Sequence, residues 1–215
     1  NKSEELMLKM FFFTVFNSNA KEFSIYDVLD AIRSDEYYLK EFKELLDYRL
    51  KRIEQVSIPM DGEVPLDVYC SYSRNQILSA FNHKDPSNMQ EGVYYSREYN
   101  ADILLVTLKK TEKLYTPTTM YKNYAINPYK FHWESQNKTT TESESGKRYI
   151  NSSSNVLLFV RESKVDMYNM TPPYTFLGPV KIESHRGNKP MEIVWKMKYR
   201  IPARFIKELS RGLAI

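Results

Sequence analysis

The chain has 215 residues, 42% of them hydrophobic, which is enough for one large domain or for a small helical domain joined to a β-rich one. Its 31 basic and 27 acidic residues give a net charge of +4, which permits an anionic partner but does not require one. The single cysteine, Cys70, excludes an internal disulfide, and the lack of a membrane-spanning run or signal peptide favours a cytoplasmic protein with no membrane partner.

The first part of the chain has the periodicity of amphipathic helices. Leu6, Met10 and Phe13 recur at steps of three and four residues, which places them on one helix face. Further helices are expected over residues 24–32 and 35–55. The sequence therefore predicts an N-terminal helical bundle as a first domain, residues 1–58.

Beyond residue 59 the pattern changes to short apolar runs, after one more short helix at 73–81. Strands are expected over residues 92–95, 101–108, 155–160, 174–177 and 191–197, a polar loop over 137–154, and a last helix near 202–211. The alternation of Met191, Ile193 and Trp195 with polar neighbours is typical of a half-buried antiparallel strand. The fold class is predicted as α+β, with residues 59–215 forming a strongly bent antiparallel sheet or a β-barrel-like domain.

Candidate catalytic groups do not combine into a known arrangement. Asp102, Glu192 and Lys196 could hold a magnesium ion as in a nuclease, but Glu192 and Lys196 are four residues apart on the polar side of a strand, which is not a convergent spacing. His132 and Glu134 could serve as an acid–base pair, yet no nucleophile accompanies them. No phosphate-binding loop is present. We expect no enzymatic activity, no catalytic residue, no metal and no cofactor.

The densest group of aromatic, amide and basic residues lies between residues 115 and 161. Residues 115–136 contain six aromatic side chains, two lysines and two prolines, and Lys147, Arg148, Tyr149 and Arg161 follow. Flat rings can stack on bases, amides can contact base edges, and cations can neutralise phosphates. The same residues could instead form the core and edge of a sheet, and composition alone does not decide between the two interpretations.

Several sequence blocks occur together in a recognisable order. They are FHWESQ at 131–136, SGKRYI at 145–150, VLLFVRE at 156–162 and PYTFLGP at 173–179. With them the chain resembles the uncharacterised C-terminal domain of bacterial superfamily II DEAD/DEAH-type helicases, which often also carry a phospholipase-D-like nuclease domain. The resemblance implies a component of a restriction or anti-phage system acting on DNA, with the helicase and nuclease domains of a longer protein as partners. The chemistry would belong to those domains.

These observations lead to the hypothesis that the domain recognises DNA, either as a duplex or through a modified or flipped base. The residues predicted to bind DNA are Tyr121, Tyr124, Tyr129, Trp133 and Tyr149 as walls of an aromatic pocket, Gln136 at a base edge, and Lys147, Arg148 and Arg161 at phosphates. Two alternatives remain open: a protein-interaction module docking on the helicase core or a phage-encoded trigger, and a cryptic nuclease that uses Asp102.

Overall fold

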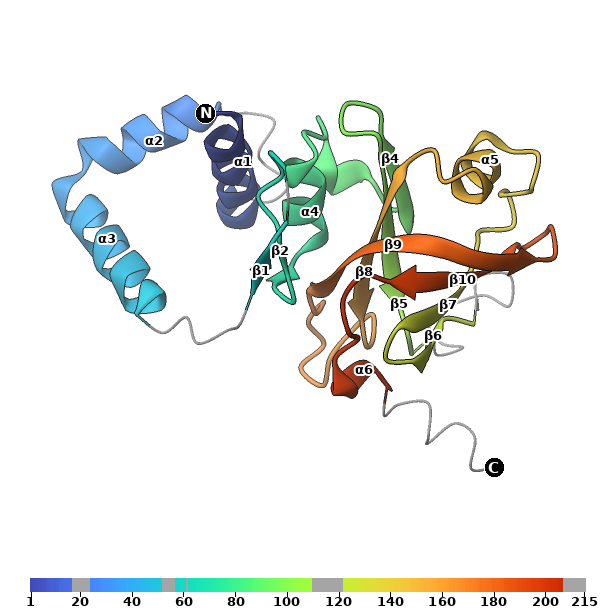
Figure 1. The fold of residues 1–215 in the computed structure, drawn as a ribbon. Helices are drawn as coiled ribbons and strands as arrows, with labels where there is room; N and C mark the ends of the chain where they lie inside the picture. Colours follow the sequence, from blue (N-terminus) through green and yellow to red (C-terminus); the bar gives the residue numbers. More distant parts are fainter. Residues whose placement is uncertain (17–23, 52–56, 61, 110–121, 207–215) are drawn as a thin grey trace. The chain divides into compact units, whose positions relative to one another are not determined.

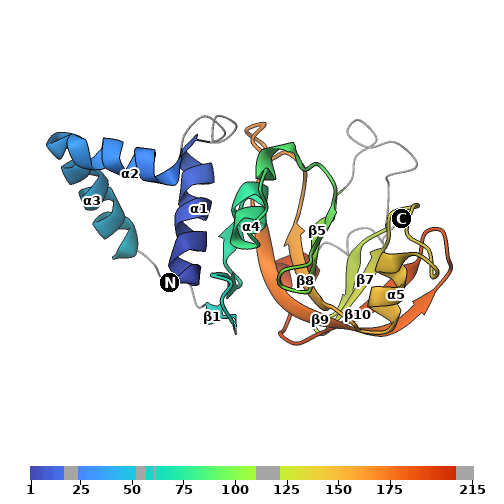
Figure 2. The ribbon, with the colours of Figure 1, turned by 90° about the horizontal axis from the view of Figure 1, so that it is seen from above.

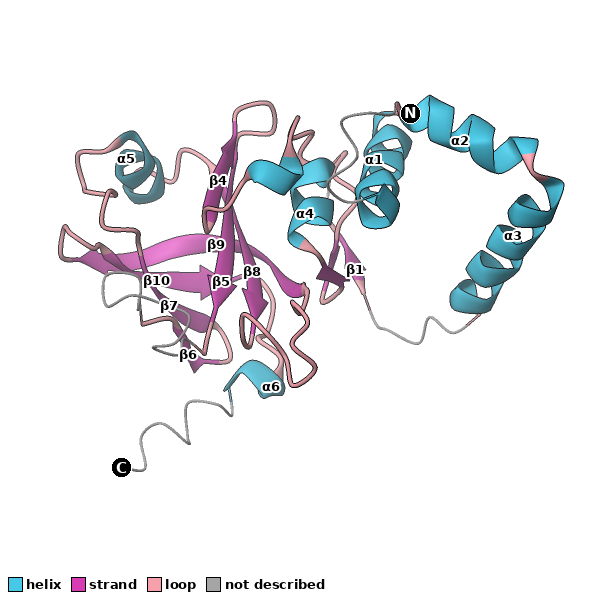
Figure 3. Cartoon of the chain, turned by 180° about the vertical axis from the view of Figure 1, so that it is seen from behind, coloured by secondary structure: helices cyan, strands magenta, loops and turns pink. Residues whose placement is uncertain are grey.

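The computed structural model describes residues 1–16, 24–51, 57–60, 62–109 and 122–206 (Figure 1). The chain divides into two compact units, Asn1–Gln90 and Glu91–Ile215. The long helices belong to the first unit and most of the strands to the second (Figure 3).

The first unit contains the three predicted N-terminal helices. Its elements are α1 (Lys2–Phe16), α2 (Ile25–Ser34), α3 (Glu36–Leu50), β1 (Ile58–Pro59), β2 (Asp67–Val68), β3 (Ser71–Tyr72), α4 (Arg74–Ala80) and the 3-10 turn η2 (Pro86–Asn88). Helix α1 packs mainly on α4, a helix that the sequence analysis assigned to the following domain, and Leu6 and Ile77 are buried. By contrast α3 has no buried residue, although Phe42 contacts the ring of Phe11.

Capping side chains explain where two helices of the first unit begin. The hydroxyl of Ser24 accepts a hydrogen bond from the backbone N–H of Asp27, whose carboxylate in turn accepts one from the Ser24 N–H. Ser73 and Gln76 form the same reciprocal pair at the start of α4. Such boxes satisfy backbone donors that the first helical turn leaves without partners.

The second unit is built around a mixed sheet. Its elements are β4 (Val93–Ser96), β5 (Ala101–Thr107), β6 (Tyr124–Asn127), β7 (Lys130–Glu134), α5 (Glu144–Ile150), β8 (Asn155–Arg161), β9 (Tyr174–Arg186), β10 (Glu192–Met197) and α6 (Ala203–Ile206). The strands lie in the order β4-β5-β8-β9-β10-β7-β6. The predicted α+β class is confirmed.

Two details of the predicted sheet are wrong. Strands β5 and β8 pair in parallel, with Ala101 opposite Asn155, so the sheet is mixed and not purely antiparallel. Both strands are almost entirely buried, which is typical of parallel strands. The sheet also does not close into a barrel, because β4 and β6 lie at opposite ends of the strand order.

The sheet bends strongly along β9, as Figure 2 shows. The pairing register shifts between Leu158 and Phe159 on β8, opposite Gly178, and again between Val194 and Trp195 on β10. Gly178 has a φ of 92°, a conformation that a residue without a Cβ adopts at little cost. Such irregularities add a residue to one strand and increase its local twist. Strand β9 continues to Arg186, well past the expected end at Leu177, because it pairs with β10 as far as Glu192.

Three elements of the second unit were not predicted from the sequence. The expected loop over residues 137–154 contains α5, which begins after Ser143, whose hydroxyl caps the N–H of Gly146. Strands β6 and β7 form a hairpin within the segment that was interpreted as a possible binding surface. Of the last predicted helix, residues 203–206 are helical and the remainder lies outside the described residues.

Candidate functional site

Two of the predicted pocket aromatics lie in the hydrophobic core. Trp133 on β7 is 4% exposed and Tyr149 on α5 is 1% exposed. Together with Trp195 on β10 they form a cluster of rings whose centroids are 5.7–6.1 Å apart. The prediction that Trp133 and Tyr149 wall one open pocket together is therefore wrong, because the two rings pack edge-on against each other in the core, although Tyr149 also borders the hollow described below.

The remaining residues of the predicted pocket do not converge. Tyr124 is half-buried and stacks on His132, with ring centroids 4.6 Å apart, whereas Tyr129 is 53% exposed in the β6–β7 turn. Gln136 is half-buried, and its backbone carbonyl accepts a hydrogen bond from the N–H of Thr139. Tyr121 lies outside the described residues.

Arg148, predicted to hold a phosphate, is engaged inside the fold. Its guanidinium donates two hydrogen bonds, both of 3.0 Å, to the carboxylate of Asp102, which is 0% exposed. Ser154 donates a third bond of 2.5 Å to the same carboxylate, and the guanidinium also lies 3.8 Å from the ring centre of Tyr95. The hydrogen bonds to Asp102 raise the pKa of Arg148 above its ordinary value. We therefore correct its role: Arg148 neutralises a buried carboxylate and ties α5 to β5.

The other two predicted phosphate contacts differ from each other. Arg161 is 7% exposed, donates to the hydroxyl of Thr107 at 2.9 Å and lies over the ring of Tyr174, so it too belongs to the interior. Lys147 is exposed on α5, 3.4 Å from the carboxylate of Glu142. Of the predicted cations, only Lys147 is open to solvent.

The acid–base and nuclease candidates also have structural partners. Nδ1 of His132 lies 2.9 Å from the Lys122 carbonyl oxygen, and Glu134 accepts the Lys122 N–H at 2.9 Å, so both residues fix the start of the β6–β7 hairpin. Glu192 accepts hydrogen bonds from Arg186, which, with a smaller contribution from His132, lower its pKa. In the sheet order, β8 and β9 separate the strands of Asp102 and Glu192, and these two carboxylates therefore do not converge on one metal.

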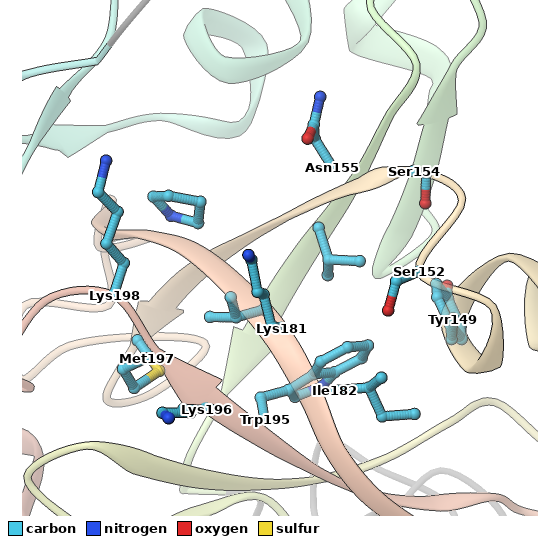
Figure 4. A pocket seen from close by; sticks show the side chains of 13 residues that line it. Tyr149, Ser152, Ser154, Asn155, Lys181, Ile182, Trp195, Lys196, Met197 and Lys198 are labelled. Atoms are coloured by element: carbon cyan, nitrogen blue, oxygen red, sulfur yellow. The ribbon is translucent and has the colours of Figure 1, made fainter.

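The best candidate site is a hollow bounded by the α5–β8 turn, β8, β9 and β10 (Figure 4). Its volume is about 840 Å³, within the range of pockets that take small molecules. The apolar part of its lining is Tyr149, Val156, Pro179, Val180, Ile182, Trp195 and Met197, and the polar part is Ser152, Ser154, Asn155, Lys181, Lys196 and Lys198. We call this site the lysine hollow.

The lysines and the neutral polar groups occupy different parts of the lysine hollow. Lys181, Lys196 and Lys198 come from β9, β10 and the residue that follows β10, whereas Ser152, Ser154 and Asn155 come from the turn after α5 and the start of β8 (Figure 4). Lysines thus border one part of the hollow, and hydroxyls and an amide border another, next to apolar side chains. This combination suits a ligand that carries an anionic group and a flat, partly polar ring.

The sheet register brings like charges together in the lysine hollow. Lys181 and Lys196 are directly opposite each other on neighbouring antiparallel strands, so their side chains share a face of the sheet. Neither has an ion-pair partner among the described residues. Lys130 lies opposite Lys196 on the other side but is paired with Glu183 at 2.8 Å. Like charges directly opposite each other destabilise a sheet, and a bound anion would relieve that repulsion.

A second feature of the lysine hollow is an unused hydrogen-bond donor. Trp195 lines the hollow and is 1% exposed, and its Nε1 has no acceptor among the described residues. A buried donor without a partner costs stability, so such a group in a folded protein calls for an explanation. Trp195 and Lys196 are successive residues of β10, so this donor lies on the opposite face of the sheet from the side chains of Lys181 and Lys196.

The sequence contained only part of the signal for the lysine hollow. Lys196 lies on the polar side of the strand that was predicted from alternation, but Lys181 lies beyond the predicted end of its strand. The two residues are brought together by pairing of β9 with β10. Pairing between strands has no local signature in one sequence, so reasoning along the chain placed the site between residues 115 and 161 instead.

The second unit is thus an α+β domain with an open, bent, mixed sheet and a lysine-lined hollow. In the described ranges there is neither a group of acidic, histidine or cysteine side chains able to hold a metal ion nor a helix long and apolar enough to span a membrane. The model of a family described as a domain of unknown function, DUF3427, matches residues 66–209, and the chain belongs to that family. No curated protein matches the chain.

Proposed function

We propose that the second unit is a non-catalytic DNA-recognition domain that binds through the lysine hollow. The observation that carries the proposal is the pair Lys181 and Lys196, adjacent, exposed and without an ion-pair partner among the described residues. Contacts to phosphates supply most of the affinity with which proteins bind DNA independently of its sequence. The net charge of +4 is consistent with such a partner.

The same site supports recognition of a modified or flipped base. A base taken out of the helix needs an apolar surface and a few polar groups at its edge. Val156 and Ile182 belong to the apolar lining, and Asn155 offers an amide. In this proposal the lysines bind the flanking phosphates, and Asn155 contacts the base edge.

The ordered sequence blocks, through their resemblance to the C-terminal domain of bacterial helicases, indicate the protein in which this domain would act. The domain would act within a longer bacterial restriction or phage-defence protein in the cytoplasm, where helicase and nuclease domains perform the chemistry. This domain would supply target recognition to them.

Binding of labelled oligonucleotides, followed by fluorescence anisotropy, tests the proposal. We expect the protein to bind DNA, and to bind duplexes with a modified or mismatched base more tightly than fully paired, unmodified ones. The variant Lys181→Ala/Lys196→Ala should lose most of the affinity for every oligonucleotide. The control Lys138→Ala/Lys147→Ala removes two exposed lysines that are paired with Glu91 and Glu142 away from the lysine hollow, and it should bind as wild type does. Loss of binding in the control alone would move the site to the surface around Lys138 and Lys147 and contradict the proposal.

A protein-interaction module is the second candidate, and one observation favours it. Helix α3 exposes large apolar side chains, among them Tyr37 at 76%, Leu45 at 56% and Leu50 at 68%. Helices with apolar residues on several faces are normally covered. Docking through this surface would be nearly independent of salt, whereas binding through phosphates weakens steeply with salt.

A further inference from the structure

The loop between β8 and β9 exposes three large apolar side chains at its tip. Met167, Tyr168 and Met170 are 86%, 78% and 65% exposed. Single exposed apolar residues are common on protein surfaces, but three within four positions form a patch that favours a partner.

The tip of this loop is held in one shape by its own hydrogen bonds. Oδ1 of Asp166 accepts the backbone N–H groups of Tyr168 and Met170 at 2.9 and 2.8 Å. The Asp166 N–H also donates to the Met170 carbonyl at 2.9 Å, and Asn169 adopts a positive φ of 59° that closes the turn. Because the backbone is already ordered, inserting the tip into a partner would cost little conformational entropy.

A cationic segment connects this loop with the lysine hollow. Residues 198–204 contain Lys198, Arg200 and Arg204 and no acidic residue. The Lys198 N–H donates to the Pro179 carbonyl at the hollow, and Arg204 donates to the hydroxyl of Thr175 at the base of the loop. The segment therefore follows β9 from the hollow towards the loop, and positive charge extends along that path.

We propose that the apolar tip, residues Met167–Met170, inserts between base pairs of the DNA that the lysine hollow binds. Methionine and other apolar side chains act as such wedges in proteins that unstack DNA, and the cationic segment favours nucleic acid over a neutral protein surface as the partner of the tip. This inference rests on the proposed function of the hollow.

The distance along β9 from the hollow to the base of the loop gives the scale of the contacted DNA. Pro179 and Tyr174 are five residues apart on β9, roughly 17 Å at the usual rise of a strand. At about 3.4 Å per base pair this corresponds to about five base pairs. We therefore expect the tip to act on duplexes that extend about that far or further on one side of the nucleotide bound in the hollow.

The test compares two duplexes that each carry one mismatched nucleotide. In the short duplex the shorter side of that nucleotide has about three base pairs, and in the long duplex it has about ten. The triple variant Met167→Ser/Tyr168→Ser/Met170→Ser should lose affinity for the long duplex by on the order of tenfold, the size typical of lost base stacking, and should bind the short duplex as wild type does. Its salt dependence should be unchanged, which also verifies that the hollow is folded. The control Tyr37→Ser removes an equally exposed ring from the first unit and should have no effect.

Different results overturn different parts of the account. If the triple variant binds both duplexes as wild type does, or loses affinity equally for both, the wedge is refuted while the DNA-binding function stands. If the wild-type protein binds neither duplex, the proposed function itself is refuted. Capture of a protein by the tip, without an effect on DNA, would also refute the wedge.

Discussion

The substitution Arg148→Ala should destabilise the second unit without removing a DNA contact. The carboxylate of Asp102 would stay fully buried. Of the three side-chain hydrogen bonds that it accepts from Arg148 and Ser154, only the one from the Ser154 hydroxyl would remain. Breaking a buried ion pair from one side typically costs about 3–5 kcal/mol. For a unit of this size each kcal/mol lowers the melting temperature by roughly 4 °C. We therefore expect a decrease of about 12 °C or more.

Thermal and urea unfolding, followed by circular dichroism, measure this loss. The double variant Asp102→Leu/Arg148→Met should recover much of the stability, because apolar residues of similar size often replace a buried ion pair without loss. Well below its melting temperature, Arg148→Ala should bind DNA as wild type does. A decrease in stability below about 1 kcal/mol, the range of surface ion pairs, would refute the reasoning, as would a loss of DNA affinity in the folded variant.

Three further predictions concern stability. Gly146→Ala should unfold the second unit or destabilise it by several degrees in a thermal melt, because the added Cβ would overlap the Thr140 carbonyl oxygen. Hydrogen bonds from Arg186 lower the pKa of Glu192. The ionised carboxylate therefore stabilises the fold at pH values above the ordinary glutamate pKa, and this stabilisation is lost as the pH falls through the lowered value. When melting temperatures are measured at decreasing pH, Glu192→Gln should lose less stability than wild type. Ser73→Ala should cost about 1 kcal/mol in urea unfolding, because it removes a helix cap.

The sequence predicted those elements whose pattern is local. The alternation along Met191–Met197 identified β10, and the three- and four-residue spacing identified α1 to α3. Helix α5 was missed because its polar residues resemble a loop, and its stabilising contacts are distant: Arg148 reaches Asp102 on β5, and Tyr149 packs on Trp195. Neither contact is visible in the order of residues along the chain.

The position of the candidate site could not be predicted from the sequence. A density of aromatic and basic residues is compatible with a binding surface, but the same side chains fill a core equally well. Trp133 and Tyr149 do so here, and Arg148 is drawn inwards by a buried carboxylate. Lys181 and Lys196, by contrast, are fifteen positions apart in the sequence numbering and become neighbours through strand pairing.

The slope of DNA affinity against salt concentration tests the central claim most directly. For each phosphate contact that is lost, the logarithmic slope should become shallower by about one. We predict that Lys181→Ala/Lys196→Ala reduces the slope by about two relative to wild type, and that Lys138→Ala/Lys147→Ala leaves it unchanged. An equal slope for wild type and the Lys181/Lys196 variant would contradict the account, because it would mean that these lysines contact no phosphate.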